Sequence, residues 1–284
     1  MTTLLACIDA SRFAEAVCDH AAWAATRLDA TVELLHVLDR HEIDPVTTDR
    51  SGTLGFGEQE ALLEELAALD EQRGRLALRQ GQSLLVEATT RLRAAGLTDI
   101  QAHQRHGSLV DTLADLRVSV DLIVIGKQGE ATGRAQTELG MNLERVARAI
   151  LTPLLVTSQL FRPIRRVLIA FDGSRGARKA VSYVANTPLL AGATCYVVTV
   201  GDDHPGAREQ LAEATEMLTT AGFETTSDVL PGHPEQVIAA ETEAGRADLL
   251  VMGSHGHSRI RTLIIGSTTT ALLRSSAVSV LMVR

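Results

Sequence analysis

"RRVLIAFDGSRGARKAVSYVANTPLLAGATCYVVTVG", residues 165–201, joins two short apolar runs through a segment with a helical pattern. This alternation is typical of a βαβ unit, in which a helix connects two parallel strands. The runs "DLLVMG" (248–253) and "SVLMV" (279–283) are almost continuously apolar, as expected of strands that are covered on both faces. The sequence therefore predicts an α/β fold with a parallel sheet flanked by helices on both sides.

The same pattern occurs twice in the chain. Residues 8–39, "IDASRFAEAVCDHAAWAATRLDATVELLHVLD", align without a gap with residues 171–202, "FDGSRGARKAVSYVANTPLLAGATCYVVTVGD". Two further aligned pairs are "DLIVIGKQG" (121–129) with "DLLVMGSHG" (248–256), and "TPLLVTS" (152–158) with "VSVLMVR" (278–284). A repeat of this length predicts two copies of one structural unit. We therefore expect two tandem doubly wound domains, 1–158 and 164–284, joined near "SQLFRPIRR".

The first copy carries an insertion between Arg40 and His106. A polar, glycine-rich segment is followed by a leucine-rich pattern that predicts one long helix over 58–96. Gly74 and Gly81 are places where this helix could kink or break. A lid or packing helix is the favoured interpretation, and the alternative is a helix that binds a partner, which includes a second copy of the chain in a homodimer.

Composition excludes several classes of function. Hydrophobic residues make up 45% and charged residues 22% of the 284 residues, which is ordinary for a globular protein. A net charge of -8 argues against nucleic acid or an anionic membrane as partner. The start of the chain does not resemble a signal peptide, and no apolar run approaches about 18 residues, so we expect a cytoplasmic protein. Cys7, Cys18 and Cys195 have no metal-like spacing and are expected to be small buried residues.

The stretch "VMGSHGHSRIRTLIIGSTTTALL", residues 251–273, contains the spacing G-x2-G-x9-G-S after a predicted strand. Glycines let a phosphate approach backbone N–H groups, and the hydroxyls of 267–270 lie at a predicted helix N-terminus, which favours anions. The spacing differs from both the P-loop and the dinucleotide fingerprint. A plain strand-to-helix loop with turn glycines remains the alternative reading of these residues.

Together with "VLIAFDGS", "LPGHPEQVI" and "ADLLVMGSHGHS", this stretch resembles the ATP-binding type of the universal stress protein family, and the repeat makes the chain similar to a tandem member. The resemblance implies a five-stranded parallel sheet in each domain, with strand order 3-2-1-4-5. It also implies ATP with Mg2+ across the strand ends. Pairing of the two last strands is expected as well, because an apolar sheet edge is normally covered.

The resemblance assigns roles to individual residues of the second copy. Asp172 is expected to contact the ribose or the adenine edge, and Val200 to lie beside the adenine. The residues expected to surround ribose and phosphates are Gly253, His255, Gly256, Gly266, Ser267 and Thr268. No catalytic residue and no resident metal is assigned.

The first copy departs from the motif. Its corresponding residues form a possible second site: Asp9, Val37, Gly126, Gly129 and Gly140. Ten residues instead of nine separate Gly129 from Gly140, and Met141 and Asn142 replace the hydroxyl-bearing step. Lys127 could hold a phosphate there, whereas Glu130 and Glu138 would repel it. We therefore predict an altered or degenerate site in the first domain.

The sequence gives less support to metal binding and to catalysis. His255 and His257 could ligate zinc, but no cysteine lies near them in sequence. The "DAS" and "DGS" steps lack the context of a nucleophilic serine, and His103 and His106 are expected to be exposed loop residues. Slow ATP hydrolysis is compatible with the sequence, but no catalytic base is identifiable.

The sequence is therefore compatible with two functions. The first is an ATP-binding stress protein that regulates an unidentified protein partner through nucleotide-dependent conformation. The second is a nucleotide-independent interaction, small-ligand or metal-binding protein in which the tandem domains act as a built-in dimer. A measurement of nucleotide binding distinguishes the two functions, because only the first requires it.

Overall fold

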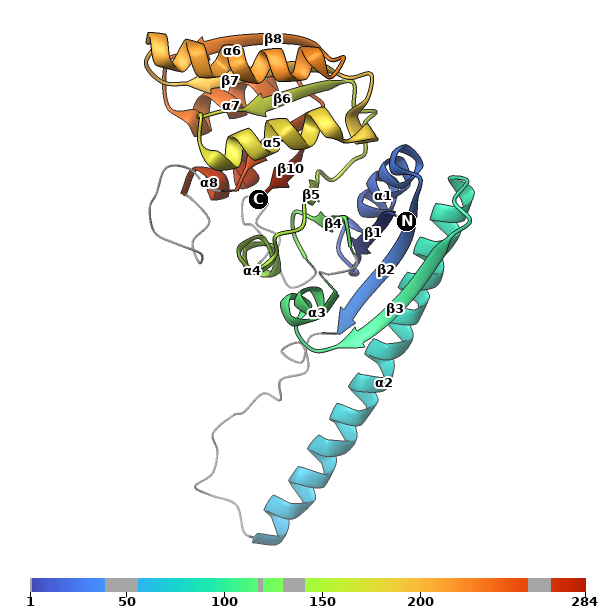
Figure 1. Ribbon diagram of the computed structural model, residues 1–284. Helices are drawn as coiled ribbons and strands as arrows, with labels where there is room; N and C mark the ends of the chain where they lie inside the picture. Colours follow the sequence, from blue (N-terminus) through green and yellow to red (C-terminus); the bar gives the residue numbers. More distant parts are fainter. Residues whose placement is uncertain (1, 39–55, 117–119, 130–140, 255–266) are drawn as a thin grey trace.

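The computed structural model describes residues 2–38, 56–116, 120–129, 141–254 and 267–284, with side chains described from residue 65 within the long helix and from residue 142 after the gap (Figure 1). The N-terminal half comprises β1 Thr2–Cys7, α1 Ala14–Leu28, β2 Ala30–Leu38, α2 Phe56–Ala94, β3 Ile100–His106, α3 Leu109–Leu116, β4 Leu122–Gly126, α4 Met141–Ala149 and β5 Leu154–Thr157. The C-terminal half comprises β6 Arg166–Ala170, α5 Arg175–Asn186, the 3-10 turn η2 Pro188–Leu190, β7 Thr194–Val200, α6 Pro205–Thr220, β8 Glu224–Leu230, α7 Pro234–Glu243, β9 Leu249–Gly253, α8 Ser267–Ser275 and β10 Ser279–Val283. The predicted alternation of strands and helices is confirmed in both halves.

The strands of the two halves form one continuous sheet. Within the described residues its order is β3-β2-β1-β4-β5-β10-β9-β6-β7-β8. Each half is a parallel sheet of order 3-2-1-4-5, as predicted. The halves join where β5 and β10 pair antiparallel, with Leu155 opposite Leu281. The expected pairing of the last strands is therefore present, and it covers an edge that each half would otherwise expose.

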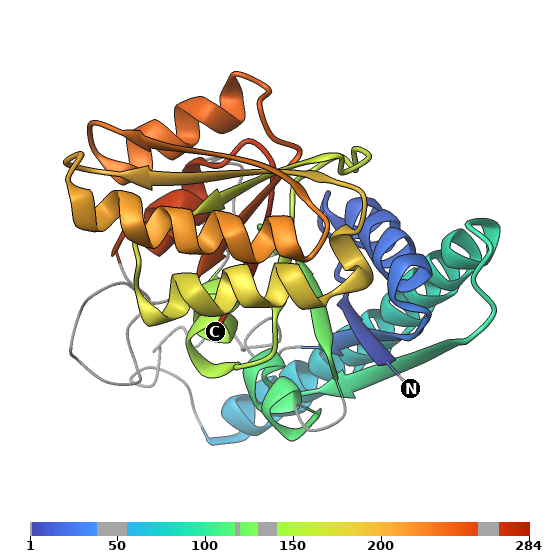
Figure 2. The same cartoon turned by 45° about the horizontal axis from the view of Figure 1, so that its top comes forward.

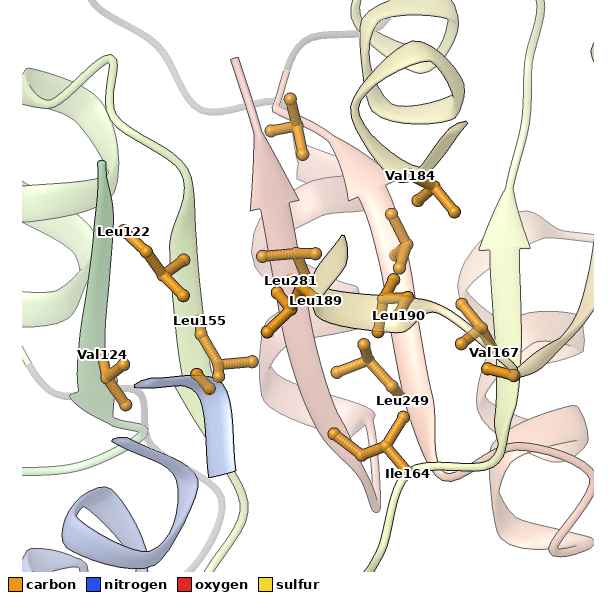
Figure 3. Close-up of a cluster of buried hydrophobic side chains, with 14 of the residues drawn as sticks. Leu122, Val124, Leu155, Ile164, Val167, Val184, Leu189, Leu190, Leu249 and Leu281 are labelled. Carbon is orange, nitrogen blue, oxygen red and sulfur yellow. The ribbon is translucent and has the colours of Figure 1, made fainter. Parts of the chain in front are cut away.

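The core lies on both faces of this sheet. One face packs against α1, α2, α5 and α6, and the other against α3, α4, α7 and α8. Helix α5 follows the helical period, with Ala177, Ala180, Val181 and Val184 buried, and it lies beside α6 (Figures 1 and 2). Figure 3 shows that buried leucines continue from β4 and β5 across β10 and β9 toward β6. Each fully buried leucine contributes about 1.5–3 kcal/mol, so the junction between the halves is part of the core.

The predicted insertion helix is one uninterrupted helix of 39 residues, and neither Gly74 nor Gly81 ends it. Its C-terminal part packs on β2 and β3, where a Cβ on Gly81 would lie 2.2 Å from Gln104 Nε2 and 2.5 Å from His36 Cδ2. Gly81 therefore permits close approach of the helix to the sheet. The preceding part extends away from the strands (Figure 1), and Leu66, Leu69 and Leu76 are exposed there. The packing role is confirmed for the C-terminal part only.

The cysteines are buried as expected. Burial raises the pKa of the thiols of Cys7, Cys18 and Cys195 to about 12. Thiols with such pKa values carry almost no thiolate at neutral pH and are poor nucleophiles. Among the described residues, no helix is both long enough and apolar enough to span a bilayer.

Candidate functional site

The carboxyl ends of β6, β7 and β9 lie next to one another in the C-terminal half. Ala170, the last residue of β6, is in register with Val198 of β7 and with Met252 of β9. The carboxyl ends of the strands form one edge of a parallel sheet. Ligands bind beyond this carboxyl edge, at the point where the strand order reverses. The structure brings Asp172, Val200 and Gly253 to this edge, on three different loops or strand ends.

The loop after β6 holds Asp172 through its own backbone. The Ser174 N–H donates to Asp172 Oδ1 at 3.0 Å, and Gly173 between them has a φ of 69°. Glycine adopts this left-handed conformation without steric cost. The Ser174 hydroxyl then accepts from the Ala177 N–H at 3.2 Å and caps α5. The turn presents the exposed Asp172 side chain at the carboxyl edge of the sheet, as the predicted role requires.

Gly253 has a packing function that the motif did not reveal. A Cβ on this residue would lie 2.4 Å from the Gly176 carbonyl carbon and 2.6 Å from the Ala177 nitrogen. The end of β9 therefore lies directly against the first turn of α5, and only glycine fits there. The predicted contact of Gly253 with a ligand stays a prediction, since the glycine is already required by the fold.

Ser267 and Thr268 begin α8 and are exposed. The next residue, Thr269, is buried, and its hydroxyl donates to the Ser254 carbonyl at 3.5 Å, which ties the start of α8 to the end of β9. The N-terminus of a helix carries about half a positive charge and orphan N–H groups. This edge of the sheet is therefore chemically suited to an anion. His255, Gly256 and Gly266, like His257, lie outside the described residues, so their roles stay predictions.

The N-terminal half repeats the first part of this arrangement. The Ser11 N–H donates to Asp9 Oδ1 at 3.1 Å, as Ser174 does to Asp172. Val37 lies near the end of β2, and Gly126 ends β4. A Cβ on Gly129 would lie 3.0 Å from Asp9 Oδ2, so the loop after β4 touches the Asp9 carboxylate. Gly140 lies outside the described residues.

Three further residues distinguish the two halves. Phe13 is buried and occupies the position that Gly176 has in the repeat; a Cβ on Gly126 would lie 2.7 Å from Phe13 Cβ. The Arg12 guanidinium lies 5.4 Å from the Phe13 ring centroid and donates through Nη2 to Gln128 Oε1 at 2.5 Å. This hydrogen bond bridges the loops after β1 and β4. The sequence alignment already pairs Phe13 with Gly176, and that exchange was the available signal for the difference.

The Lys127 side chain, which the sequence offered as a phosphate ligand, contacts the other half, so its contact with a phosphate stays a prediction. Its Nζ donates to the carbonyl of Ser276 at 2.9 Å, at the C-terminal end of α8 in the other half. A cation is favoured at a helix C-terminus. Burial lowers the pKa of Lys127 to about 8. Lys127 is therefore engaged in the junction between the halves.

Comparison with known proteins supports the fold. A family model described as the universal stress protein family matches residues 1–158 and 202–284. The universal stress protein Slr1230 of Synechocystis sp. is 39% identical over 287 residues, covering 100% of both chains, and a universal stress protein of Mycolicibacterium smegmatis is 26% identical, covering 99% of this chain and 96% of that one. The crystal structure of a universal stress protein from Archaeoglobus fulgidus superposes with a TM-score of 0.68 at 21% identity, covering 99% of this chain and 98% of that chain.

Proposed function

The chain belongs to the universal stress protein family, and from that premise we propose that its C-terminal half binds an adenine nucleotide, ATP with Mg2+, at the carboxyl ends of β6, β7 and β9. The observation that carries the proposal is the meeting of Asp172, Val200 and the N-terminus of α8 at this one edge. We further propose that the units 1–158 and 164–284 are the two domains of the protein. A cytoplasmic location stays a prediction.

Each side chain has a chemically suitable task in this proposal. The Asp172 carboxylate accepts hydrogen bonds from ribose hydroxyls or from the amino group of adenine, and Val200 offers an apolar surface to the base. Ser267 and Thr268, with the first N–H groups of α8, donate to phosphate oxygens. Mg2+ prefers oxygen ligands and usually enters with phosphates, whose charge it would neutralise.

The N-terminal half serves as the structural partner of the binding half in this proposal. The bridge between Arg12 and Gln128, the bulk of Phe13 and the engagement of Lys127 with Ser276 all favour a site that no longer accepts nucleotide. One nucleotide per chain is the expected stoichiometry. These same contacts support the alternative function, nucleotide-independent interaction, for the N-terminal half alone.

The proposed role is binding and regulation rather than dedicated turnover. Phosphoryl transfer needs positioned cations and an oriented water. Arg259 and Arg261, the basic residues of the nucleotide motif, lie outside the described residues, so they carry no argument for catalysis. Occupancy of the site would instead change the charge and the surface that the start of α8 offers to a partner protein.

Titration calorimetry of the full chain with ATP and Mg2+ tests the proposal. Ser267→Glu places a carboxylate where the phosphates are proposed to bind, and it should abolish binding because like charges repel. Ser83→Glu adds the same charge at an exposed position of α2 and should leave binding unchanged. Absence of binding at millimolar ATP, or equal binding by both variants, would contradict the proposal.

A further inference from the structure

A hollow of about 840 Å³ lies at the junction of the two halves, on the opposite edge of the sheet from the nucleotide site. Its lining includes Arg166 and Thr194, which begin β6 and β7. Arg27, from the last turn of α1, contributes from the N-terminal half, and Arg162 and Arg165 contribute from the connection between the halves. We call this hollow the linker pocket. Four of the residues that line it are arginines, in a chain whose net charge is -8.

The acidic residue that lines this pocket already has a cationic partner. Asp248 is the single acidic residue among the described residues that line it, and Arg166 pairs with it, with Nη2 2.7 Å from Asp248 Oδ1. The backbone N–H groups of Arg165 and Arg166 also donate to Asp248 Oδ2, at 3.1 and 2.9 Å. The Asp248 carboxylate is thus paired with the Arg166 side chain and with two backbone N–H groups. It does not neutralise the other arginines that line the pocket.

The other three guanidinium groups, those of Arg27, Arg162 and Arg165, form no ion pair within the described residues. Arg27 Nη1 donates to the Ala191 carbonyl at 2.6 Å, which is a neutral acceptor. Within the described part of the chain, Arg162 and Arg165 form neither an ion pair nor a side-chain hydrogen bond, and both are exposed. Guanidinium groups present forked donors that match phosphate oxygens in pairs. Three such groups among the residues that line one hollow favour a ligand with several negative charges.

We propose that the linker pocket binds a small anion that carries two or more phosphate groups. The volume lies within the range of small-molecule sites, about 300–1,000 Å³. The buried Ile164 and the adjacent Pro163 line the same hollow and offer an apolar surface to a non-phosphate part of the ligand. Because Arg27 belongs to α1 whereas Arg162 and Arg165 belong to the connection between the halves, a bound polyphosphate links the N-terminal half to this connection. This site is separate from the proposed nucleotide site and does not depend on it.

Titration of the full chain with inorganic tripolyphosphate, at low and at physiological salt, tests this site. The double variant Arg162→Gln/Arg165→Gln should bind at least about tenfold more weakly, since charge-assisted hydrogen bonds are lost. The matched control Arg93→Gln/Arg105→Gln removes the same charge from exposed positions on α2 and β3. It should bind like the unmodified chain. Adding Ser267→Glu to both double variants closes the proposed nucleotide site and should leave the difference in affinity between them in place.

Three results would overturn the proposal. They are no binding of tripolyphosphate at millimolar concentration, an equal loss of affinity in the two double variants, and a loss in Ser267→Glu with retention in Arg162→Gln/Arg165→Gln. The last result would assign the binding to the nucleotide site. Since both arginines of the test variant are exposed, its folding is expected to be unchanged, and a thermal melt checks this.

Discussion

His20 on α1 and Ser279 on β10 form a buried hydrogen bond between the two halves, with 2.7 Å between His20 Nε2 and Ser279 Oγ. His20 Nδ1 lies 2.7 Å from the carbonyl of Ala16, which can only accept, so Nδ1 carries a proton. The edge of the His20 ring meets the Phe161 ring, with centroids 4.9 Å apart. Burial of the imidazole favours its neutral form.

This arrangement predicts loss of stability in acid. Burial lowers the pKa of His20 below its ordinary value of 6.5, although the Ala16 carbonyl and Asp19 oppose the shift. The unfolded chain then binds more protons than the folded one, so the contribution of His20 is complete above pH 6.5 and is lost as the pH falls from there toward the lowered folded-state pKa. Urea unfolding at pH 7.5 and 5.5 should show a larger decrease in the unmodified chain than in His20→Gln. The exposed His103→Gln should behave like the unmodified chain, and equal decreases in all three would refute the assignment.

Lys127 should stabilise the junction between the halves. Lys127→Ala removes the charged donor to the Ser276 carbonyl and is expected to lower the free energy of unfolding by about 1.5–3 kcal/mol. Lys179→Ala, at an exposed position on α5, should change it by less than about 0.5 kcal/mol. Chemical denaturation at pH 7 measures both values. Similar values for the two lysines would show that the contact with Ser276 is energetically irrelevant.

The strand pair β5–β10 should couple the unfolding of the two halves. Leu281 is fully buried opposite Leu155, and Leu281→Ala is expected to cost about 2–5 kcal/mol through lost burial and a cavity. Met217→Ala, at an exposed position on α6, serves as the control. Calorimetry should show the whole unfolding transition moving in Leu281→Ala. Two transitions, of which only one moves, would contradict a shared core.

Two glycines should respond in opposite directions to substitution by alanine. At Gly253 the new Cβ meets the backbone of Gly176 and Ala177, so Gly253→Ala should destabilise the chain by about 1–3 kcal/mol. At Gly74, inside α2, a new Cβ meets nothing within 4 Å, and Gly74→Ala should stabilise by about 0.5–1 kcal/mol. Thermal melts measure both shifts. Stabilisation by Gly253→Ala would disprove the close approach of β9 to α5.

Most of the fold could be predicted from the sequence because the strands and helices leave local patterns of apolar residues. The apolar runs and the helical pattern of 165–201 specify the βαβ unit, and the repeat extends it to the other half. The pairing of β5 with β10 was implied by the resemblance to the universal stress protein family, and it agrees with the need to cover the apolar edge of each half. The direction of Lys127 could not be predicted, because it depends on where the distant end of α8 lies after the halves join.

The candidate sites were only partly accessible to sequence reasoning. The loop residues Asp172 and Asp9 were identified because they directly follow predicted strands. The bridge from Arg12 to Gln128 was missed, since it joins residues that are 116 positions apart and depends on side-chain orientation. The linker pocket was missed for the same reason: "RPIRR" looks like an ordinary connection until Arg27 is placed beside it.

The number of nucleotides bound per chain tests the central claim most directly. Native mass spectrometry of the full chain with ATP and Mg2+ should show a single bound nucleotide, which Ser267→Glu removes and Ser83→Glu leaves in place. A second bound nucleotide lost on changing Asp9 would show that the N-terminal half retains a working site. A chain that stays free of nucleotide at millimolar ATP would contradict the account.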